Sequence, residues 1–356
     1  MTTEQQVLER IERARRRPPR LTEQRITLAH GAGGKATQAL VDAVFLAAFD
    51  NPLLAPLSDA ATPTVDGSRL AFTTDSYVVS PLFFPGGNIG DLAVNGTVND
   101  LAVAGAVPRY LSAGFILEEG LPVADLTRIV ESMAAAARAA GVQIVTGDTK
   151  VVQRGRADGC YICTTGVGQL VDDAPAGPAA ARPGDAVLVS GPIGEHGVTV
   201  MLARGELAID ADLVSDTAPL HNLTGDLLAA GVPVRAMRDA TRGGVATVLN
   251  ELARAAQVAV VLEEDAIPVR PAVRGASELL GIDPLYVACE GRLVAVVAAG
   301  SEQQALAVMR ANPAGEQAAL VGRLAADPPG LVLLRTGFGG TRIVDVLVGD
   351  PLPRIC

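Results

Sequence analysis

Short apolar runs alternate with helix-like segments along most of the chain, and this alternation limits the possible folds more than any other feature. The runs suit buried strands, which we expect at residues 25–29, 69–80, 142–146, 161–167, 186–190, 257–262, 292–298, 317–323 and 331–335. Between them we expect helices at residues 37–49, 89–103, 123–140, 195–205, 217–230, 243–256 and 302–311. The alternation predicts an α/β (α+β) fold.

A segment rich in proline, alanine and glycine divides the chain into two halves. We expect a disordered or frayed arm, a first domain, a linker, a second domain and a mobile tail, at residues 1–25, 26–171, 172–184, 185–335 and 336–356. A chain of 356 residues is long enough to build two hydrophobic cores. The sequence therefore predicts two α/β domains.

Composition and charge exclude several classes of protein. The formal charge of −10 argues against nucleic acid or an anionic membrane as the main partner. No apolar run has the length of a membrane span, and the N-terminus lacks the apolar core of a secretory signal. Four scattered cysteines are too few for a disulfide framework in a chain of this size. We expect a cytoplasmic protein with reduced thiols.

A glycine-rich turn near the N-terminus imitates two nucleotide-binding motifs. Gly31, Gly33 and Ala36 have the spacing of the dinucleotide fingerprint, but Asp50 lies in a loop and not at the end of a second strand. A phosphate-binding P-loop is also excluded, because Lys35 is followed by alanine. We favour a mobile glycine-rich segment that contacts phosphate together with Lys35, and dinucleotide binding stays the alternative.

Aspartates beside glycine turns are the main sign of a binding site. Asp75, Asp148 and Asp239 follow or end apolar runs, and Asn99-Asp100 lies on the predicted helix after the second run. Ligands of α/β sheets bind where strands end, and carboxylates with phosphate oxygens are what Mg²⁺ prefers. Any one of these aspartates alone would more often cap a helix or a turn. Together they predict a metal–phosphate site.

Two further segments add polar groups to this prediction. In the segment Thr241-Arg242-Gly243, the arginine and the backbone N–H groups can hold a phosphate at the start of the next helix. The segment Thr149-Lys150 directly follows Asp148 and adds a hydroxyl and a cation.

The cysteine pair Cys160 and Cys163 suggests zinc or redox chemistry, but no second pair of ligands stands at the required spacing. If the predicted strand begins already at Gly159, their odd separation places the two side chains on opposite faces. We therefore interpret them as buried structural cysteines. His196 is expected at a helix start, where it caps or packs.

The chain ends in Pro353-Arg354-Ile355-Cys356. A cysteine in the last position cannot be a prenylation signal, which needs three further residues. Such a residue is ordinarily part of a frayed end. Here two prolines, Pro351 and Pro353, stiffen the approach, and a thiol on a mobile tail suits a covalent carrier.

Taken together, these segments resemble the HypE family of hydrogenase maturation proteins, which are carbamoyl dehydratases. That family belongs to the superfamily of aminoimidazole ribonucleotide synthetase, selenophosphate synthetase and thiamine-monophosphate kinase. The matching segments are HGAGG (30–34), residues 73–108 with GTVNDLA, ILEEG (116–120), GDTKVV (147–152), SGPIGEHG (190–197), DATRGG (239–244), ACEG (288–291) and LPRIC (352–356). The resemblance covers about residues 26–356.

The resemblance implies a fold and a set of site residues. The N-terminal sheet would form a barrel with its counterpart in a homodimer, next to a C-terminal α/β domain. Asp75, Asp100 and Asp148 would bind Mg²⁺ and ATP, with Asp239 beside them. Lys150 and Glu290 would handle protons near the cysteine. Asn88 departs from the family pattern, in which we expect aspartate.

The resemblance also implies a reaction and its partners. A carbamoyltransferase, HypF, would load Cys356 with a carbamoyl group, and ATP-dependent dehydration would convert that group to a thiocyanate. The HypC–HypD complex would receive the cyanide ligand for the iron centre of a [NiFe]-hydrogenase. Two alternatives stay open: a sister synthetase or kinase such as selenophosphate synthetase, and a non-enzymatic metal or thiol carrier that uses the cysteine pair.

Overall fold

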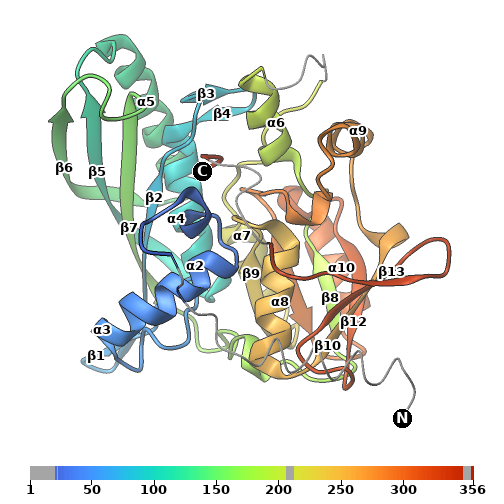
Figure 1. Ribbon diagram of the computed structural model, residues 1–356. Helices are drawn as coiled ribbons and strands as arrows, with labels where there is room; N and C mark the ends of the chain where they lie inside the picture. The colour runs from blue at the N-terminus through green and yellow to red at the C-terminus, as the bar shows by residue number, and fades with distance from the viewer. Residues whose placement is uncertain (1–20, 22, 206–211, 348–353) are drawn as a thin grey trace.

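The computed structural model describes residues 21, 23–205, 212–347 and 354–356, and it shows two sheets with helix α4 between them (Figure 1). The expected N-terminal arm lies almost entirely outside these residues. Within them, no helix is both long enough and apolar enough to cross a bilayer. The two mixed sheets with covering helices confirm the α/β prediction.

The first sheet has the strand order β1-β2-β7-β5-β6. Its strands are β1 (Thr64–Val65), β2 (Ser68–Tyr77), β5 (Ala106–Glu118), β6 (Gln143–Val152) and β7 (Cys160–Leu170). Helices α4 (Ile89–Val103) and α5 (Val123–Ala139) cover one face, and the short hairpin of β3 (Phe83–Phe84) and β4 (Gly87–Asn88) leads into α4. The opposite face of the sheet carries exposed apolar side chains.

Strand β5 is absent from the sequence prediction, and its absence explains an error in β6. Strand β6 pairs in parallel with β5 and continues to Val152, whereas we expected it to end at Thr146. Asp148 therefore lies within a strand and not at its end. A strand can continue only where a neighbour supplies backbone partners, and the prediction lacked that neighbour.

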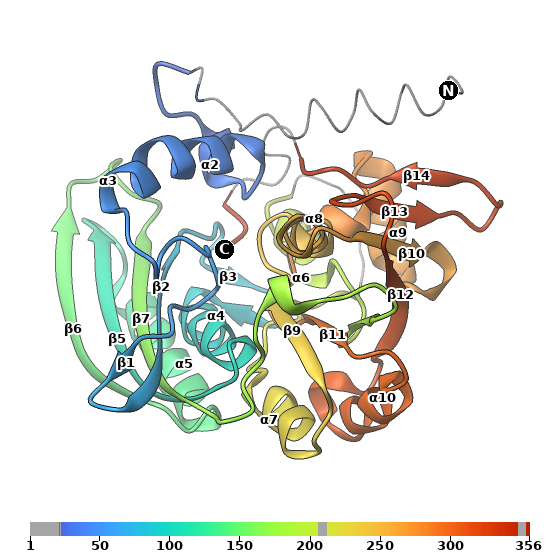
Figure 2. The same cartoon turned by 90° about the horizontal axis from the view of Figure 1, so that it is seen from below.

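The second sheet has the order β14-β13-β10-β12-β8-β11-β9. Its strands are β8 (Ala186–Val189), β9 (Val234–Asp239), β10 (Ala259–Glu263), β11 (Leu293–Val297), β12 (Ala319–Ala325), β13 (Val332–Arg335) and β14 (Thr341–Ile343). Helices α7 (His221–Ala229) and α10 (Glu302–Ala311) pack on one face, and α8 (Gly244–Ala256) packs on the other. Helices α6 (Glu195–Ala203) and α9 (Pro271–Leu280) lie beside this sheet (Figure 2).

Helix α4 joins the two units because nearly all of its residues are buried. It contacts β2, β5 and β7 in the first unit and α7 and β9 in the second. The Asn88 side chain accepts a hydrogen bond from the Gly90 amide at 2.8 Å, which caps the helix. Gly90 also allows the close approach of α5, because a Cβ there would lie 2.3 Å from the Ile129 carbonyl oxygen. This helix brings Asn99 and Asp100 to the boundary between the units.

Two predicted segments differ in the structure. Residues 25–29 were expected to form a strand, but residues 28–31 form a 3₁₀ turn, and the Thr27 amide donates to His30 Nδ1 at 3.0 Å. This turn precedes α2 (Lys35–Leu40), a π-helical turn (Val41–Leu46) and α3 (Ala47–Phe49). The prediction of a mobile tail from Thr336 is wrong for the part of the tail up to Val344. Strand β14 pairs with β13, and Val344 is fully buried, so this part belongs to the second sheet.

Candidate functional site

The C-terminal residues lie between the two units, where the chain end is marked in Figure 1. The Val78 amide donates to the Cys356 backbone oxygen at 3.1 Å, and the Ser80 amide donates to the Arg354 carbonyl at 3.2 Å. Between them, Ile355 is buried in a hydrophobic core to which both units contribute. The last three residues thus form a short strand-like extension beside residues 78–80.

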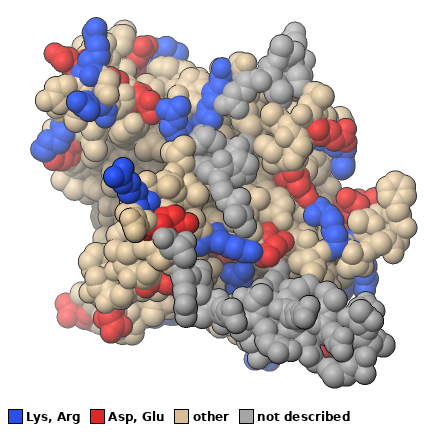
Figure 3. Space-filling model, viewed as in Figure 1, with Lys and Arg blue, Asp and Glu red and all other residues tan. Residues whose placement is uncertain are grey.

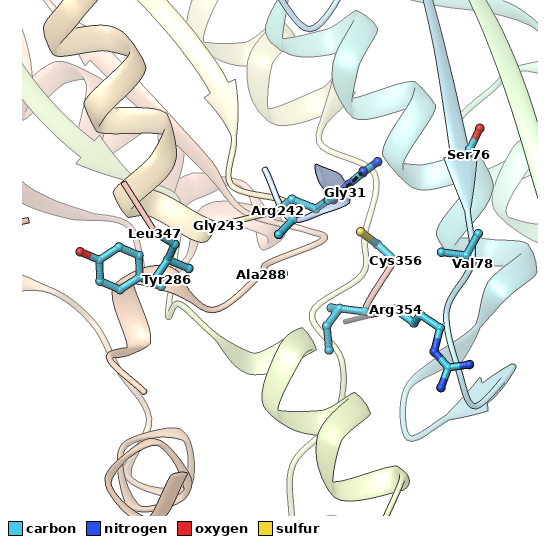
Figure 4. A pocket seen from close by; sticks show the side chains of 12 residues that line it. Gly31, Ser76, Val78, Arg242, Gly243, Tyr286, Ala288, Leu347, Arg354 and Cys356 are labelled. Atoms are coloured by element: carbon cyan, nitrogen blue, oxygen red, sulfur yellow. Dashed lines mark hydrogen bonds between the residues drawn. The ribbon is translucent and has the colours of Figure 1, made fainter. Parts of the chain in front are cut away.

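The Cys356 thiol borders a cavity of about 80 Å³. Figure 4 shows its sulfur directed toward the guanidinium end of Arg242, with Ser76 and Val78 on the other side. Burial, followed by the charge of Glu290, raises the pKa of this thiol to about 12, although Arg242 opposes this. Within this site the thiol is therefore held protonated at neutral pH.

Glu290 is a buried carboxyl group beside the thiol. Its Oε1 has no hydrogen-bond partner among the described residues. Its backbone N–H donates to Asp216 Oδ1 at 2.9 Å, and its carbonyl oxygen accepts from Asn99 Nδ2 at 3.2 Å. Burial, followed by the charges of Asp239, Asp216 and Asp75, raises the pKa of Glu290 well above its usual range. A protonated acid with a free oxygen can exchange a proton with a neighbouring group.

Three carboxylates form a cluster at the boundary between the units: Asp59, Asp100 and Asp239 each offer an oxygen, and these oxygens lie within 4.8 Å of one another. Thr73 Oγ1 donates to Asp100 Oδ2 at 2.7 Å, and Arg238 pairs with Asp59 at 2.8 Å. Asp100 and Asp239 are predicted from the sequence, whereas Asp59 is not. That residue lies in a loop with no neighbouring strand end or glycine motif to mark it.

The cluster has the properties of a divalent cation site. Burial and the charges of the neighbouring carboxylates raise the pKa values of Asp100 and Asp239 well above the usual range. Burial also raises the pKa of Asp59 to about 6 although Arg238 opposes this. Close oxygen ligands with excess negative charge fit Mg²⁺, which prefers carboxylate oxygens. The residues present therefore fit the metal that the family resemblance implies.

Asp75 connects the carboxylate cluster to the thiol. Its Oδ2 accepts a hydrogen bond from the Tyr77 hydroxyl at 3.0 Å, and its Oδ1 lies 3.9 Å from Arg242. Its charge also raises the pKa of both Asp239 and Cys356. On the face seen in Figure 3, acidic and basic side chains lie side by side in the middle of the molecule.

The glycine-rich segment and the start of α8 meet near this site. Gly243 has φ +73° and directly precedes α8, and a Cβ on Gly33 would lie 3.1 Å from the Arg242 carbonyl oxygen. Thr241 accepts a hydrogen bond from the Gly244 amide at 2.8 Å, and Lys35 Nζ lies 3.0 Å from Asp345. A second cavity, of about 340 Å³, lies between this segment and α8 and is lined by Gly33, Gly34, Thr37, Arg238, Thr247 and Glu251.

Asp148, Thr149 and Lys150 are not brought to this site within one chain. They lie on β6, an exposed edge strand, and Lys150 Nζ pairs with Asp148 at 2.7 Å. Strands β7 and β5 separate β6 from β2, which carries Asp75. Three interstrand spacings of about 4.8 Å put β6 about 14 Å from β2. Within one chain, Asp148 therefore does not join the other aspartates of the predicted metal–phosphate site.

Four other predicted positions have defined surroundings. Cys160 is buried and Cys163 is exposed on the opposite face of β7, which confirms the alternation but corrects the prediction that both are buried. One ion cannot take both thiols in this geometry. Asn88 caps α4 and lines a different cavity from that of the thiol. Asn99 uses both amide N–H groups on backbone carbonyls, at Ala218 and Glu290.

Comparison with known proteins shows the family to which this chain belongs. Residues 57–170 match the N-terminal domain of AIR synthase related proteins, and residues 182–333 match the C-terminal domain. The carbamoyl dehydratase HypE of Rhizobium leguminosarum bv. viciae is 54% identical over 333 residues, which cover 93% of this chain and 95% of that protein. The chain belongs to the HypE family of carbamoyl dehydratases.

Solved structures of HypE proteins share the fold. A HypE in complex with HypF has 46% identity and a TM-score of 0.82, and covers 87% of this chain and all of that chain. A HypE in complex with ATP has 48% identity and a TM-score of 0.78, and covers 93% of this chain and all of that chain. Together with the family match, they confirm the two-domain fold predicted from the HypE-like motifs.

Replacing one carboxylate of the cluster by an amide should stabilise the metal-free protein. Asp100 has a raised pKa in the folded state, so its ionisation costs stability as the pH rises through that pKa. Asp100→Asn removes this cost while its amide oxygen can still accept from Thr73. We expect a higher free energy of unfolding than wild type at about pH 8 in the presence of a chelator, with the difference shrinking as the pH falls.

The exposed Asp173→Asn variant is the matched control and should show no such dependence on pH. Chemical denaturation at several pH values measures both. A lower stability of Asp100→Asn at about pH 8 would contradict the assignment of uncompensated negative charge to the cluster.

Proposed function

We propose that the chain dehydrates a carbamoyl group on its own Cys356 to a thiocyanate, with ATP as the activating substrate, and so supplies cyanide for [NiFe]-hydrogenase maturation. The observation that carries this proposal is the docked thiol. The last residue of the chain reaches the boundary between the two units and lies beside Glu290 and Arg242. A carrier cysteine needs such a position, because its cargo must meet the reacting groups.

The reaction requires an oxygen to leave carbon. The carbamoyl oxygen attacks the γ-phosphorus of ATP, the bond to the β-phosphate oxygen breaks, and ADP leaves. The C–O bond of the phosphorylated intermediate then breaks, phosphate departs, and the two N–H protons are lost to give S–C≡N. Glu290 in its ionised form would accept a proton through its unpartnered Oε1, and Arg242 would stabilise the charge that develops on the phosphorylated oxygen.

We propose that Asp59, Asp100 and Asp239, with Asp75 beside them, bind Mg²⁺. The ion, when bound, would supply positive charge to the phosphoryl oxygens. The close spacing of three carboxylate oxygens and their raised pKa values support this assignment. Asp148 would join such a site only from another chain.

We place the nucleotide between the glycine-rich segment and α8. The cavity there has about 340 Å³ and falls within the usual range of about 300–1,000 Å³ for small-molecule pockets. It borders the carboxylate cluster, because Arg238 lines the cavity and pairs with Asp59. The backbone N–H groups around Gly243, with Thr241, Arg242 and Lys35 near them, would contact phosphate.

A homodimer would bring the remaining residues into the site. Large apolar side chains lie exposed on the face of the first sheet that α4 and α5 leave open, among them Phe72, Tyr110 and Ile116. By strand register, Asp148 and Lys150 project from this same face. Two such faces packed together would form the barrel of the family and let each chain supply Asp148, Thr149 and Lys150 to the other's thiol. We therefore propose that Lys150 acts in trans.

We also propose partners and domain limits, which the family resemblance and the sequence suggest. A HypE is known in complex with HypF, and we propose HypF as the protein that loads Cys356. The HypC–HypD complex would accept the product. We propose a first domain over residues 26–171, a linker over 172–184 and a second domain from 185, which the sheet division supports.

Extending the chain past Cys356 should abolish dehydration. The cavity at the thiol has about 80 Å³, so added residues do not fit while the docked position is kept. We expect a variant with several glycines after Cys356, and the Cys356→Ala variant, to bind ATP like wild type but to form no thiocyanate. Mass spectrometry of the C-terminal peptide and ATP titration measure these effects. Normal turnover by the extended chain would contradict the requirement for a terminal thiol.

Mixed dimers test whether Lys150 acts on the other chain. Lys150→Met and Cys356→Ser homodimers should both be inactive. After mixing and exchange of subunits, one site in each mixed dimer would combine an intact Lys150 with an intact Cys356, so activity should return to about one quarter of wild type if exchange is statistical. Activity that stays absent in verified mixed dimers would show that both residues act within one chain.

A further inference from the structure

The docked C-terminus is also held by a buried histidine, which the reaction itself does not use. His196, the second residue of α6, is fully buried. Its Nε2 lies 2.9 Å from the carbonyl oxygen of Ile355, and its Nδ1 lies 2.7 Å from Ser215 Oγ. Both ring nitrogens are therefore occupied, one by the residue next to the carrier cysteine.

The direction of these hydrogen bonds follows from their partners. The Ile355 carbonyl can only accept, so His196 Nε2 must donate to it. The hydroxyl of Ser215 accepts from the Thr217 amide at 3.1 Å, which leaves its proton free to donate to Nδ1. The hydrogen bonds from the Thr217 amide to Ser215 and from Ser215 to His196 thus fix one neutral tautomer of the imidazole.

We infer that His196 is a positioning residue, which holds the C-terminus docked by donating the Nε2–H hydrogen bond to Ile355 and thereby places the Cys356 thiol in the reaction site. The consequence for dehydration rests on the proposed function, but the docking itself does not.

The surroundings of His196 support this role. Its ring packs edge-on against Phe84, with 5.4 Å between the ring centroids, so the imidazole cannot turn freely. Burial lowers the pKa of His196 to about 4, which keeps the ring neutral. A neutral donor suits a contact that must form and break, because the tail has to leave the site to receive its cargo and deliver its product.

Two substitutions separate the hydrogen bond from the packing. His196→Phe keeps a ring against Phe84 and removes the donor, whereas His196→Gln offers an amide N–H at nearly the same reach. The measurement is the rate at which iodoacetamide alkylates Cys356 in the full chain, followed by the mass of the C-terminal peptide, with glutathione in the same tube as the reference thiol. A docked thiol with a raised pKa reacts slowly, and a released thiol reacts as an ordinary one.

We expect His196→Phe to be alkylated about tenfold faster than wild type, as loss of one buried hydrogen bond implies, and His196→Gln to stay near wild type. Wild-type rates in a folded His196→Phe variant, or equal increases in both variants, would overturn the inference. If His196→Phe does not fold, Ser215→Ala removes the donor to Nδ1 without changing the ring. An increase of several-fold in that variant supports the inference, and an unchanged rate overturns it.

A second readout links docking to the reaction. Protein already carrying the carbamoyl group should convert it to thiocyanate more slowly in His196→Phe than in wild type, with unchanged affinity for ATP. An unchanged conversion rate in a variant with a released thiol would overturn the positioning role. If wild type itself forms no thiocyanate, the proposed function fails, while the alkylation rates still decide whether His196 holds the tail.

Discussion

The backbone pairing of residues 354–356 with residues 78–80 is the interaction on which the rest of the site depends. It uses the amides of Val78 and Ser80, which follow directly after β2, and so it fixes the chain end to a rigid element of the first unit. Backbone pairing does not depend on the side chain that it positions. Under the proposed carrier role, the C-terminal cysteine would therefore bring different chemical groups to the same place.

The second unit completes the site through charge and burial. It supplies Arg242, Glu290 and Asp239, while the first unit supplies Asp75 and Asp100. Helix α4 sets the spacing between these groups, because it packs against both sheets and its Asn99 amide holds the Glu290 backbone. Carboxyl groups gathered in a poorly hydrated place raise one another's pKa values, and this cost to stability is the expected signature of a functional site.

Much of this arrangement could be predicted from local sequence patterns. Helix α4 was predicted with its exact limits, Ile89–Val103, and the structure adds that Asn88 caps it. Asp75, Asp239 and Cys356 were found because glycines, apolar runs and the chain end mark them. Asp59 was missed because a loop aspartate has no local pattern, and only the folded chain brings it to Asp100 and Asp239. Strand β5 was missed for a similar reason: its partners lie on distant segments. The separation of Lys150 on β6 from Asp75 on β2 follows from the order of strands in the sheet, which a local sequence pattern does not show.

The central claim is that the carried group loses its oxygen on Cys356 while it is docked in this site. The most direct measurement is carbon-13 magnetic resonance of the purified wild-type protein after loading with a ¹³C-labelled carbamoyl group. We predict that the thiocarbamate carbonyl signal persists without nucleotide and is replaced by a protein-bound thiocyanate signal when ATP and Mg²⁺ are added. A thiocarbamate signal that survives complete hydrolysis of the ATP, or a label released from the protein without a thiocyanate signal, would contradict the account.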